Sequence, residues 1–241
     1  MVSSTPSCRG TCRRGRTPVE FRVGDRPAVR APVHVAAPEA RTGIVCDIDD
    51  TALLTGLQRP LSAARRTFTR AFAQRAPVEG MADLLTAVHD GPAGSGGGGP
   101  VVYLSNGPWN FNEPLTRFLD RHGFPAGALL LTDWGPSSEG FFRDGRLHKR
   151  RSLQRLRTDH PGVRWFLVGD DGEHDPQIYR EFAREHPGDV EAVALREVGD
   201  VLPSGGQDGD DRVELVGEVP VVRGPDGHVL LRRLRAALAV R

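Results

Sequence analysis

Lysine is almost absent from this chain of 241 residues: Lys149 is the only one, and the other 31 of the 32 basic residues are Arg. The 31 acidic residues leave a formal net charge of +1, which argues against a nucleic-acid binder that relies on neutralising phosphates. Apolar windows of about 18 residues are also absent, and the Arg-rich start lacks the apolar run of a secretory signal. The sequence therefore predicts no transmembrane segment and no nucleic-acid partner.

Cysteine is scarce as well, with three residues at positions 8, 12 and 46. No nearby His and no second pair of cysteines completes a zinc site around Cys8 and Cys12. A reduced, cytoplasmic environment is the simplest interpretation. The 38% of apolar residues is enough for one domain with a full core, which excludes a wholly disordered chain.

The first 41 residues form a basic, partly extended segment that is too poor in apolar residues to fold alone. It holds eight Arg against three acidic residues, and strand-like alternation is confined to residues 19–23 and 33–35. Two interpretations stay open. The segment is either the remnant of a β domain whose beginning is missing, or a strand or two on the edge of the main domain.

Residues 42–200 have the pattern of a doubly wound α/β domain, with a Rossmann-like parallel sheet. Short apolar runs, typical of strands buried on both faces, occur at residues 43–46, 101–104, 128–131, 165–168 and 190–195. Helical apolar spacing occurs between them, at residues 61–72, 81–88, 115–119 and 153–156. Alternating strands and helices predict a parallel sheet covered on both sides.

Residues 201–241 are predicted to form a C-terminal extension. An acidic loop around residues 208–211 precedes a turn at residues 225–227, and the chain ends in a basic amphipathic helix that contains Leu230, Leu231 and Leu234. The leucines of this helix either dock on the domain or lie on a membrane surface, and docking is favoured.

Acidic and small polar residues follow four of the predicted strands, where an open α/β sheet binds its ligands. The segments are Asp47-Ile48-Asp49-Asp50-Thr51, Ser105-Asn106, Thr132-Asp133 and the stretch from Gly169 to Asp175. Several carboxylates at one edge raise one another's pKa unless a cation lies between them. Carboxylates without a nearby His–Cys set favour Mg²⁺ as that cation.

These segments, taken together, resemble the haloacid dehalogenase superfamily of phosphohydrolases, and within it the catalytic domain of the actin-patch phosphatidate phosphatase family. The matching stretches, in the family's order, are residues 43–55 (GIVCDIDDTALLT), 103–109 (YLSNGPW), the pair His148-Lys149, and 167–179 (LVGDDGEHDPQIY). The resemblance covers about residues 30–200, and agreement of several motifs is more specific than any one of them. It implies a sheet of the haloacid dehalogenase type and a Mg²⁺-dependent phosphatase that acts on a phosphatidate-like lipid through an aspartyl-phosphate.

The resemblance also implies roles for individual residues. Asp47 would be the nucleophile, and Asp49 the general acid and base. Phosphate binding would fall to Thr51, Ser105, Asn106 and Lys149, with Thr51 also holding the loop in shape. The Mg²⁺ ligands would be the Asp47 carboxylate, the Asp49 backbone carbonyl and Asp170, with Asp171 and Asp175 in support.

One residue departs from the family pattern, because Asp171 stands where the family usually has Ser. This extra carboxylate either strengthens metal binding or points to solvent. Trp109 either packs under the site or touches the non-phosphate part of a substrate, and packing is favoured. His174 receives no role.

Two alternative functions stay open at this point. One is a phosphatase of the same superfamily that acts on a soluble phosphate ester instead of a lipid at a membrane surface. The other is a receiver-like phospho-switch that is phosphorylated on Asp133. The position of Lys149 at a helix start, rather than at a strand end, speaks against the switch.

Overall fold

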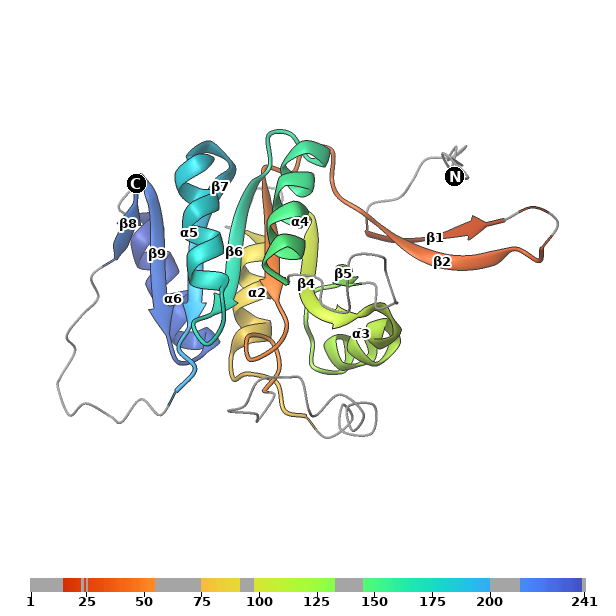
Figure 1. The fold of residues 1–241 in the computed structure, drawn as a ribbon, viewed down its shortest axis with the longest axis horizontal. Coiled ribbons are helices and arrows are strands. Elements are labelled where there is room, and N and C mark those ends of the chain that lie inside the picture. The colour runs from red at the N-terminus through yellow and green to blue at the C-terminus, as the bar shows by residue number, and fades with distance from the viewer. Residues whose placement is uncertain are drawn as a thin grey trace.

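The computed structural model describes residues 15–22, 24, 26–54, 75–91, 98–132, 145–199 and 213–239. In these residues a mostly parallel sheet of seven strands has helices on both faces (Figure 1). Its strands are β3 (Thr42–Asp47), β4 (Val101–Pro108), β5 (Ala128–Thr132), β6 (Arg164–Asp170), β7 (Val190–Arg196), β8 (Glu214–Val216) and β9 (Val219–Gly224). The helices are α2 (Met81–Asp90), α3 (Asn112–Arg121), α4 (Gly145–Asp159), α5 (Asp175–Glu185) and α6 (Gly227–Ala239), with short 3-10 turns η2 (Trp109–Phe111) and η3 (Pro187–Asp189). The predicted strands are thus confirmed as β3 to β7.

The strand order, β5-β4-β3-β6-β7-β9-β8, reverses direction in the middle of the sheet. From β3 the chain moves outward through β4 and β5, and from β6 it moves the opposite way through β7 to β9. Strands β3 and β6 lie side by side and parallel, with Cys46 opposite Val168. A reversal of this kind opens a crevice beyond the carboxyl ends of the two central strands, at the lower edge of the sheet in Figure 1.

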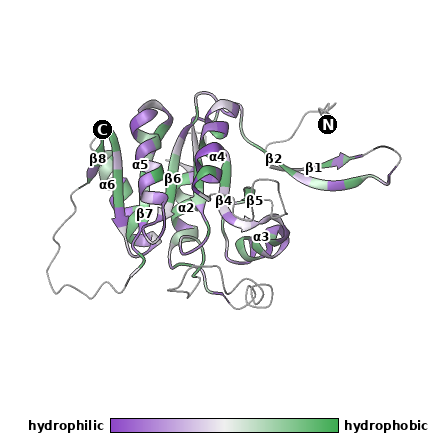
Figure 2. Ribbon diagram, in the orientation of Figure 1, coloured by the Kyte–Doolittle hydropathy of each residue, from purple (hydrophilic) through white to green (hydrophobic). Residues whose placement is uncertain are grey.

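The core has two layers because the central strands are buried on both faces, as parallel strands between helices are. One layer packs apolar residues of α2, α3 and α6 against the sheet, and the other packs those of α4 and α5. Hydropathy follows this arrangement, since the strands are mostly apolar while α4 and α5 show polar residues on their outer sides (Figure 2). The two layers hold the strand ends, and so the site, in fixed positions.

The sheet continues past residue 200, which differs from the predicted end of the domain. Strand β9 pairs in parallel with β7, and β8 pairs with β9 in antiparallel fashion. Val219 and Val221 of β9 are buried in the core layer of α4 and α5. Leu230 and Leu234 of α6 are buried in the other layer, so the last helix docks on the domain. The acidic loop at residues 208–211 lies outside the described residues.

The N-terminal segment forms a hairpin with a sheet of its own. Strand β1 (Gly15–Phe21) pairs with β2 (Val29–Val35) in antiparallel fashion, and neither pairs with the seven-stranded sheet. The hairpin extends away from the body in Figure 1. Its strands therefore do not lie on the edge of the main sheet, and the alternative, a remnant of a β domain, stays a prediction. The helix predicted at residues 61–72 lies outside the described residues.

None of the helices in the described ranges combines the length and the apolar character needed to cross a membrane.

Candidate active site

Three buried carboxylates meet at the carboxyl edge of the two central strands. Asp47 is the last residue of β3, Asp170 is the last residue of β6, and Asp175 begins α5. Each offers an oxygen, and the three oxygens lie within 4.8 Å of one another. The parallel pairing of β3 and β6 brings the first two together, and the loop before α5 folds back to add the third.

Lys149 lies between two of these carboxylates. It comes from α4, and its ammonium donates to Asp47 Oδ1 at 2.6 Å and to Asp175 Oδ1 at 2.5 Å. Only 3% of the Lys149 side chain is exposed. Burial by itself lowers the pKa of Lys149, but the charges and hydrogen bonds of Asp47 and Asp175 outweigh burial and raise the pKa above its usual value. Lys149 is therefore a cation at neutral pH.

One ammonium does not balance the negative charge of this cluster. Burial raises the pKa of Asp47 well above its usual value; Lys149 opposes this, and the charges of Asp175 and Asp170 add to it. Burial, with a further contribution from Asp175, raises the pKa of Asp170 to about 6. Oδ2 of Asp175 is buried and has no hydrogen-bond partner among the described residues. Several hard oxygen donors and excess negative charge are what a Mg²⁺ site requires, so the residues present fit that ion.

Asp49 is not one of the three clustered carboxylates and contacts β4 instead. Its Oδ2 accepts a hydrogen bond of 3.2 Å from the Ser105 hydroxyl, and Ser105 Oγ in turn accepts one of 2.9 Å from the Gly107 backbone N–H. Burial raises the pKa of the Asp49 carboxyl, while the Ser105 hydrogen bond and the charge of Arg75 lower it. A raised pKa suits a carboxyl group that has to carry a proton.

The loop after β3 turns sharply at Asp50, beyond the two aspartates. Asp50 has a φ of 54°, in the left-handed region that Asp tolerates better than most residues. Arg196, at the end of β7, donates to the Asp50 backbone oxygen at 2.6 Å. The Thr51 hydroxyl is buried and lies 3.5 Å from Asp170 Oδ2, so Thr51 connects the β3 and β6 loops.

Asn106 closes the site from the side of β4. Its backbone oxygen accepts a hydrogen bond of 2.9 Å from the Thr132 hydroxyl. Its amide side chain packs against the start of α4, so closely that a Cβ on Gly145 would lie 2.7 Å from Nδ2. Oδ1 of Asn106 is buried and has no hydrogen-bond partner among the described residues. The unpartnered atom is an acceptor, so any hydrogen bond from this side chain to a phosphoryl oxygen would come from Nδ2.

Asp171 points elsewhere, although it directly follows Asp170. Its Oδ1 accepts a hydrogen bond of 2.8 Å from the Val198 N–H, and its Oδ2 accepts one of 3.4 Å from Arg223 on β9. Asp171 is not part of the carboxylate cluster, and it does not simply point to solvent either. His174 is exposed just before α5, and Asp133 lies outside the described residues.

Two arginines at this edge were not predicted, namely Arg196 and Arg223. Both lie near the end of a strand in the second half of the sheet, and both anchor a loop of the site. A signal was present in the sequence, because Arg196 directly follows four apolar residues and Arg223 directly follows two. A charge in that position is typical of the carboxyl edge of a sheet.

The comparisons identify the family to which these residues belong. Residues 42–197 match the family described as phosphatidate phosphatase APP1, catalytic domain. The chain belongs to this family. The match contains all four motif segments and confirms the resemblance seen in the sequence.

The curated relatives are much longer than this chain. Phosphatidate phosphatase APP1 of Saccharomyces cerevisiae is 25% identical over 181 residues, which are 75% of this chain and 30% of the yeast protein. An uncharacterised protein of Schizosaccharomyces pombe is 26% identical over 156 residues, which are 64% of this chain and 25% of that protein. The chain thus spans about a quarter to a third of these relatives.

Two solved structures of a Pnkp1/Rnl/Hen1 complex, one of them described as an RNA repair complex, resemble the chain less closely. The first has a TM-score of 0.45 at 18% identity, and the match covers 75% of this chain and 58% of the chain in that structure. The second has a TM-score of 0.44 at 19% identity, and the match covers 69% of this chain and 45% of the chain in that structure.

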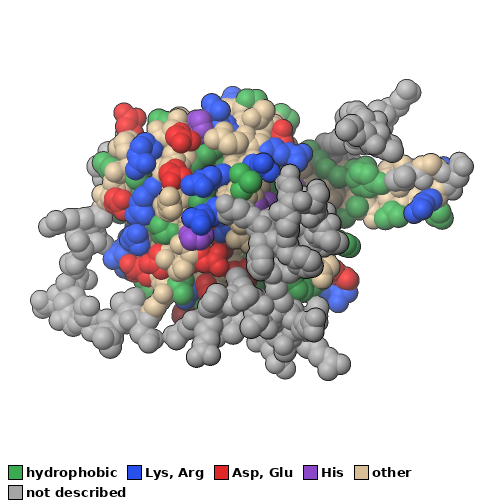
Figure 3. Space-filling model, viewed as in Figure 1, with side chains coloured by type: hydrophobic (Ala, Val, Ile, Leu, Met, Phe, Trp, Pro, Cys, Tyr) green, Lys and Arg blue, Asp and Glu red, His purple; other side chains and the backbone are tan. Residues whose placement is uncertain are grey.

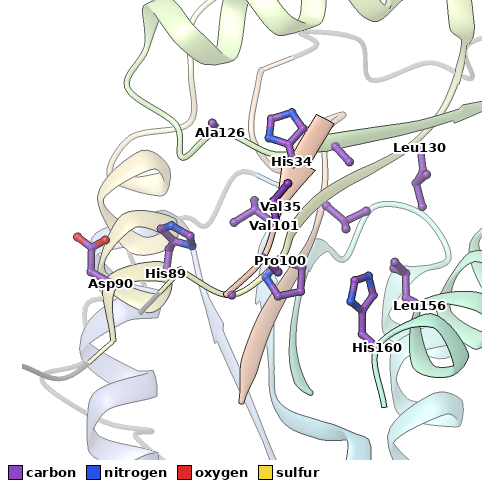
Figure 4. Close-up of a pocket in the computed structure, with 15 residues that line it drawn as sticks. His34, Val35, His89, Asp90, Pro100, Val101, Ala126, Leu130, Leu156 and His160 are labelled. Carbon is purple, nitrogen blue, oxygen red and sulfur yellow. The ribbon is translucent and has the colours of Figure 1, made fainter. Parts of the chain in front are cut away.

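A separate cavity of about 500 Å³ lies at the opposite edge of the sheet (Figure 4). It is lined by the end of the hairpin at His34, the end of α2 at His89, the first residues of β4 and the region after α4 at His160. These are the amino ends of the strands, so the cavity is distinct from the carboxylate cluster.

Proposed function

We propose that this chain is a phosphoric monoester hydrolase that acts on a lipid phosphate of the phosphatidate class. The observation that carries the proposal is the convergence of four motif segments, in a domain of this family, on the carboxyl ends of β3 and β6. A sheet of the haloacid dehalogenase type and a cytoplasmic location at a membrane surface belong to the same proposal. The substrate comes from the name of the yeast relative, and the chemistry from the residues of the site.

The proposed reaction has two steps and uses residues of this chain. A carboxylate oxygen of Asp47 attacks phosphorus, the bond to the lipid oxygen breaks, and Asp49 protonates that oxygen to release the alcohol. Asp49 then accepts a proton from water as the water oxygen attacks the same phosphorus, and inorganic phosphate leaves with Asp47 regenerated. The Ser105 hydroxyl, which donates its one proton to Asp49 here, would donate it to a phosphoryl oxygen instead once substrate is bound.

Lys149 and Asn106 would stabilise the charge of the transferring phosphoryl group. Lys149 holds Asp47 at 2.6 Å, so its ammonium also lies close to any phosphoryl group that Asp47 attacks. The carboxylates of Asp47 and Asp170, supported by Asp175, would hold Mg²⁺. When bound, the ion would add electrostatic stabilisation of the phosphoryl oxygens.

Replacing Asp47 by Asn tests the mechanism, because the amide keeps the shape of the side chain and loses its nucleophilic charge. We expect Asp47→Asn to lose all turnover on every phosphomonoester while the circular dichroism spectrum stays native. Chelation of divalent ions should stop wild-type turnover, and added Mg²⁺ should restore it. Metal-dependent hydrolysis that persists in Asp47→Asn would contradict the mechanism.

The lipid substrate needs a separate test. Rates on phosphatidate in mixed micelles are compared with rates on soluble sugar phosphates and nucleotides at equal concentration. A higher kcat/KM for phosphatidate is expected. Preference for a soluble ester would leave the mechanism intact and replace the substrate.

A further inference from the structure

Large apolar side chains are exposed around the mouth of the site. In the described residues eight large apolar side chains are exposed, and four of them, Leu54, Trp109, Leu147 and Val198, belong to segments at the carboxyl edge of the sheet. Trp109 is 64% exposed, so the favoured expectation that it packs under the site is wrong. Large apolar side chains that are exposed at the edge carrying the site suit a surface that meets a partner.

Each of these residues is connected to a different segment of the site. Leu54 follows Leu53, which forms a β-bridge with Asp49. Trp109 begins the 3-10 turn directly after β4, and Leu147 lies in the first turn of α4, two residues before Lys149.

Val198 completes the set on the side of β6 and β7. Its backbone N–H donates to Asp171, and its Cβ lies 3.5 Å from the position that a Cβ on Gly172 would take. The four residues, named here the apolar rim, therefore follow β3, β4 and β7 and begin α4. These segments lie on both sides of the central strands in the order of the sheet.

We propose that the apolar rim is a lipid-binding surface that dips into the bilayer interface around the site, with Trp109 and Leu147 as its anchors. The inference rests on the proposed lipid phosphatase function. It commits to a bilayer that carries phosphomonoester lipid, because the substrate's acyl chains would stay in the membrane while its phosphate reaches Asp47. Trp is favoured at such interfaces, since its ring is apolar and its N–H can stay in contact with water.

Charge on the neighbouring helix agrees with an anionic membrane. Helix α4, which carries Leu147, has five arginines, all exposed, against one acidic residue, Asp159. Figure 3 shows basic side chains, with acidic ones among them, on the face over α4 and α5. Arg150, Arg155 and Arg157 are paired with Glu181, Asp159 and Asp189, whereas Arg151 is exposed and has no ion pair among the described residues. Arginines beside an apolar rim are typical of segments that lie on anionic lipid.

Vesicle binding tests the surface without depending on turnover. The Asp47→Asn protein is sedimented with phosphatidylcholine vesicles that contain phosphatidate, alone and combined with Trp109→Gln and Leu147→Gln. Each rim change should weaken binding about tenfold, as expected for taking one large apolar side chain out of the interface. The matched control is Leu215→Gln, because Leu215 is 62% exposed on the edge strand β8, away from the rim. Binding of the rim variants that equals binding of the Leu215→Gln control would overturn the proposal.

Fluorescence gives a second measurement on Trp109 itself. Trp165 is buried, and replacing Trp134 by Phe leaves Trp109 as the tryptophan whose surroundings change on binding. Vesicles with bromine on the acyl chains should shift its emission to shorter wavelength and quench it. An unchanged spectrum in the presence of bound vesicles would show that another surface binds the lipid.

Turnover separates this proposal from the proposed function. Trp109→Gln with Leu147→Gln should keep the wild-type kcat on a soluble phosphomonoester and lose about a hundredfold on vesicle phosphatidate. Equal loss on both substrates would overturn the membrane role. If the wild type hydrolyses only soluble esters, the lipid part of the proposed function fails, and the binding and fluorescence results still decide whether the rim meets a membrane.

Discussion

Replacing Lys149 by Arg keeps the charge of the site and changes only the shape of the group that carries it. In wild type the ammonium lies 2.6 Å from Asp47 Oδ1 and 2.5 Å from Asp175 Oδ1. The side chains of all three residues are at most 5% exposed. A compact ammonium fits between two carboxylates at these distances, whereas a planar guanidinium is wider and donates in a fixed fork.

The expected loss has two parts. Forcing a larger group into a filled, buried position costs typically about 1–3 kcal/mol of unfolding free energy. Moving a charged donor away from the position of the transferring phosphoryl group costs about 10²–10³ in kcat, by analogy with the loss of one oxyanion donor. We therefore expect Lys149→Arg to fold, to unfold at lower urea, and to turn over about a hundredfold more slowly.

The assay is kcat on a soluble phosphomonoester, with urea unfolding of the same preparations. The matched control is Arg150→Lys, the reverse exchange one residue along α4, at a position 43% exposed and paired with Glu181. That control should stay within about 0.5 kcal/mol of wild type and keep its kcat. If Lys149→Arg turns over as fast as Arg150→Lys, the shape argument is refuted and the single lysine is an accident of composition.

Three further changes test the surroundings of the site. Asp171→Asn should leave kcat unchanged. It should lower the unfolding free energy by about 1 kcal/mol or less, because the ion pair of Asp171 with Arg223 is partly exposed. A large fall in kcat would place Asp171 in the catalytic cluster. Leu234→Ala should lower the unfolding free energy, measured with urea, by about 2–5 kcal/mol, because the Leu234 side chain of α6 is buried. An unchanged unfolding free energy would show that α6 is not part of the core. Gly227→Ala should cost at least about 1–3 kcal/mol, because the added Cβ would lie 2.2 Å from the Gly80 backbone. Gly188→Ala is its control, because a Cβ at Gly188 meets nothing within 4 Å, and equal stability of the two variants would contradict the close approach.

The central strands could be predicted because a strand buried on both faces leaves an unbroken apolar run in the sequence. The run at residues 43–46 became β3, and the run at residues 165–168 became β6. The place of β9 could not be predicted, since nothing within residues 219–224 says that they pair with β7 rather than stand apart. Helix α5 was not predicted either, because its first turn lies inside the acidic motif at residues 167–179.

The meeting of the site segments was predictable, but the partner of each side chain was not. Parallel strands carry their carboxyl ends to one edge, which brings Asp47 next to Asp170. Which way the side chains after the strand point depends on the backbone angles of the loop, which residue types alone do not fix. Asp49 consequently contacts Ser105, while Asp175 joins the cluster.

Asp170 and Asp171 are the same residue type and neighbours in sequence, but they have different partners in the structure. The two carboxylates are neighbours in sequence, but successive residues at a strand end point in opposite directions, so only Asp170 faces Asp47. Asp171 turns to β9, where Arg223 supplies the opposite charge. An acidic residue can therefore replace the Ser of the resembled family at this position without adding charge to the cluster. The partner that makes this possible lies 52 residues further along the chain, on a strand that the acidic motif does not reveal.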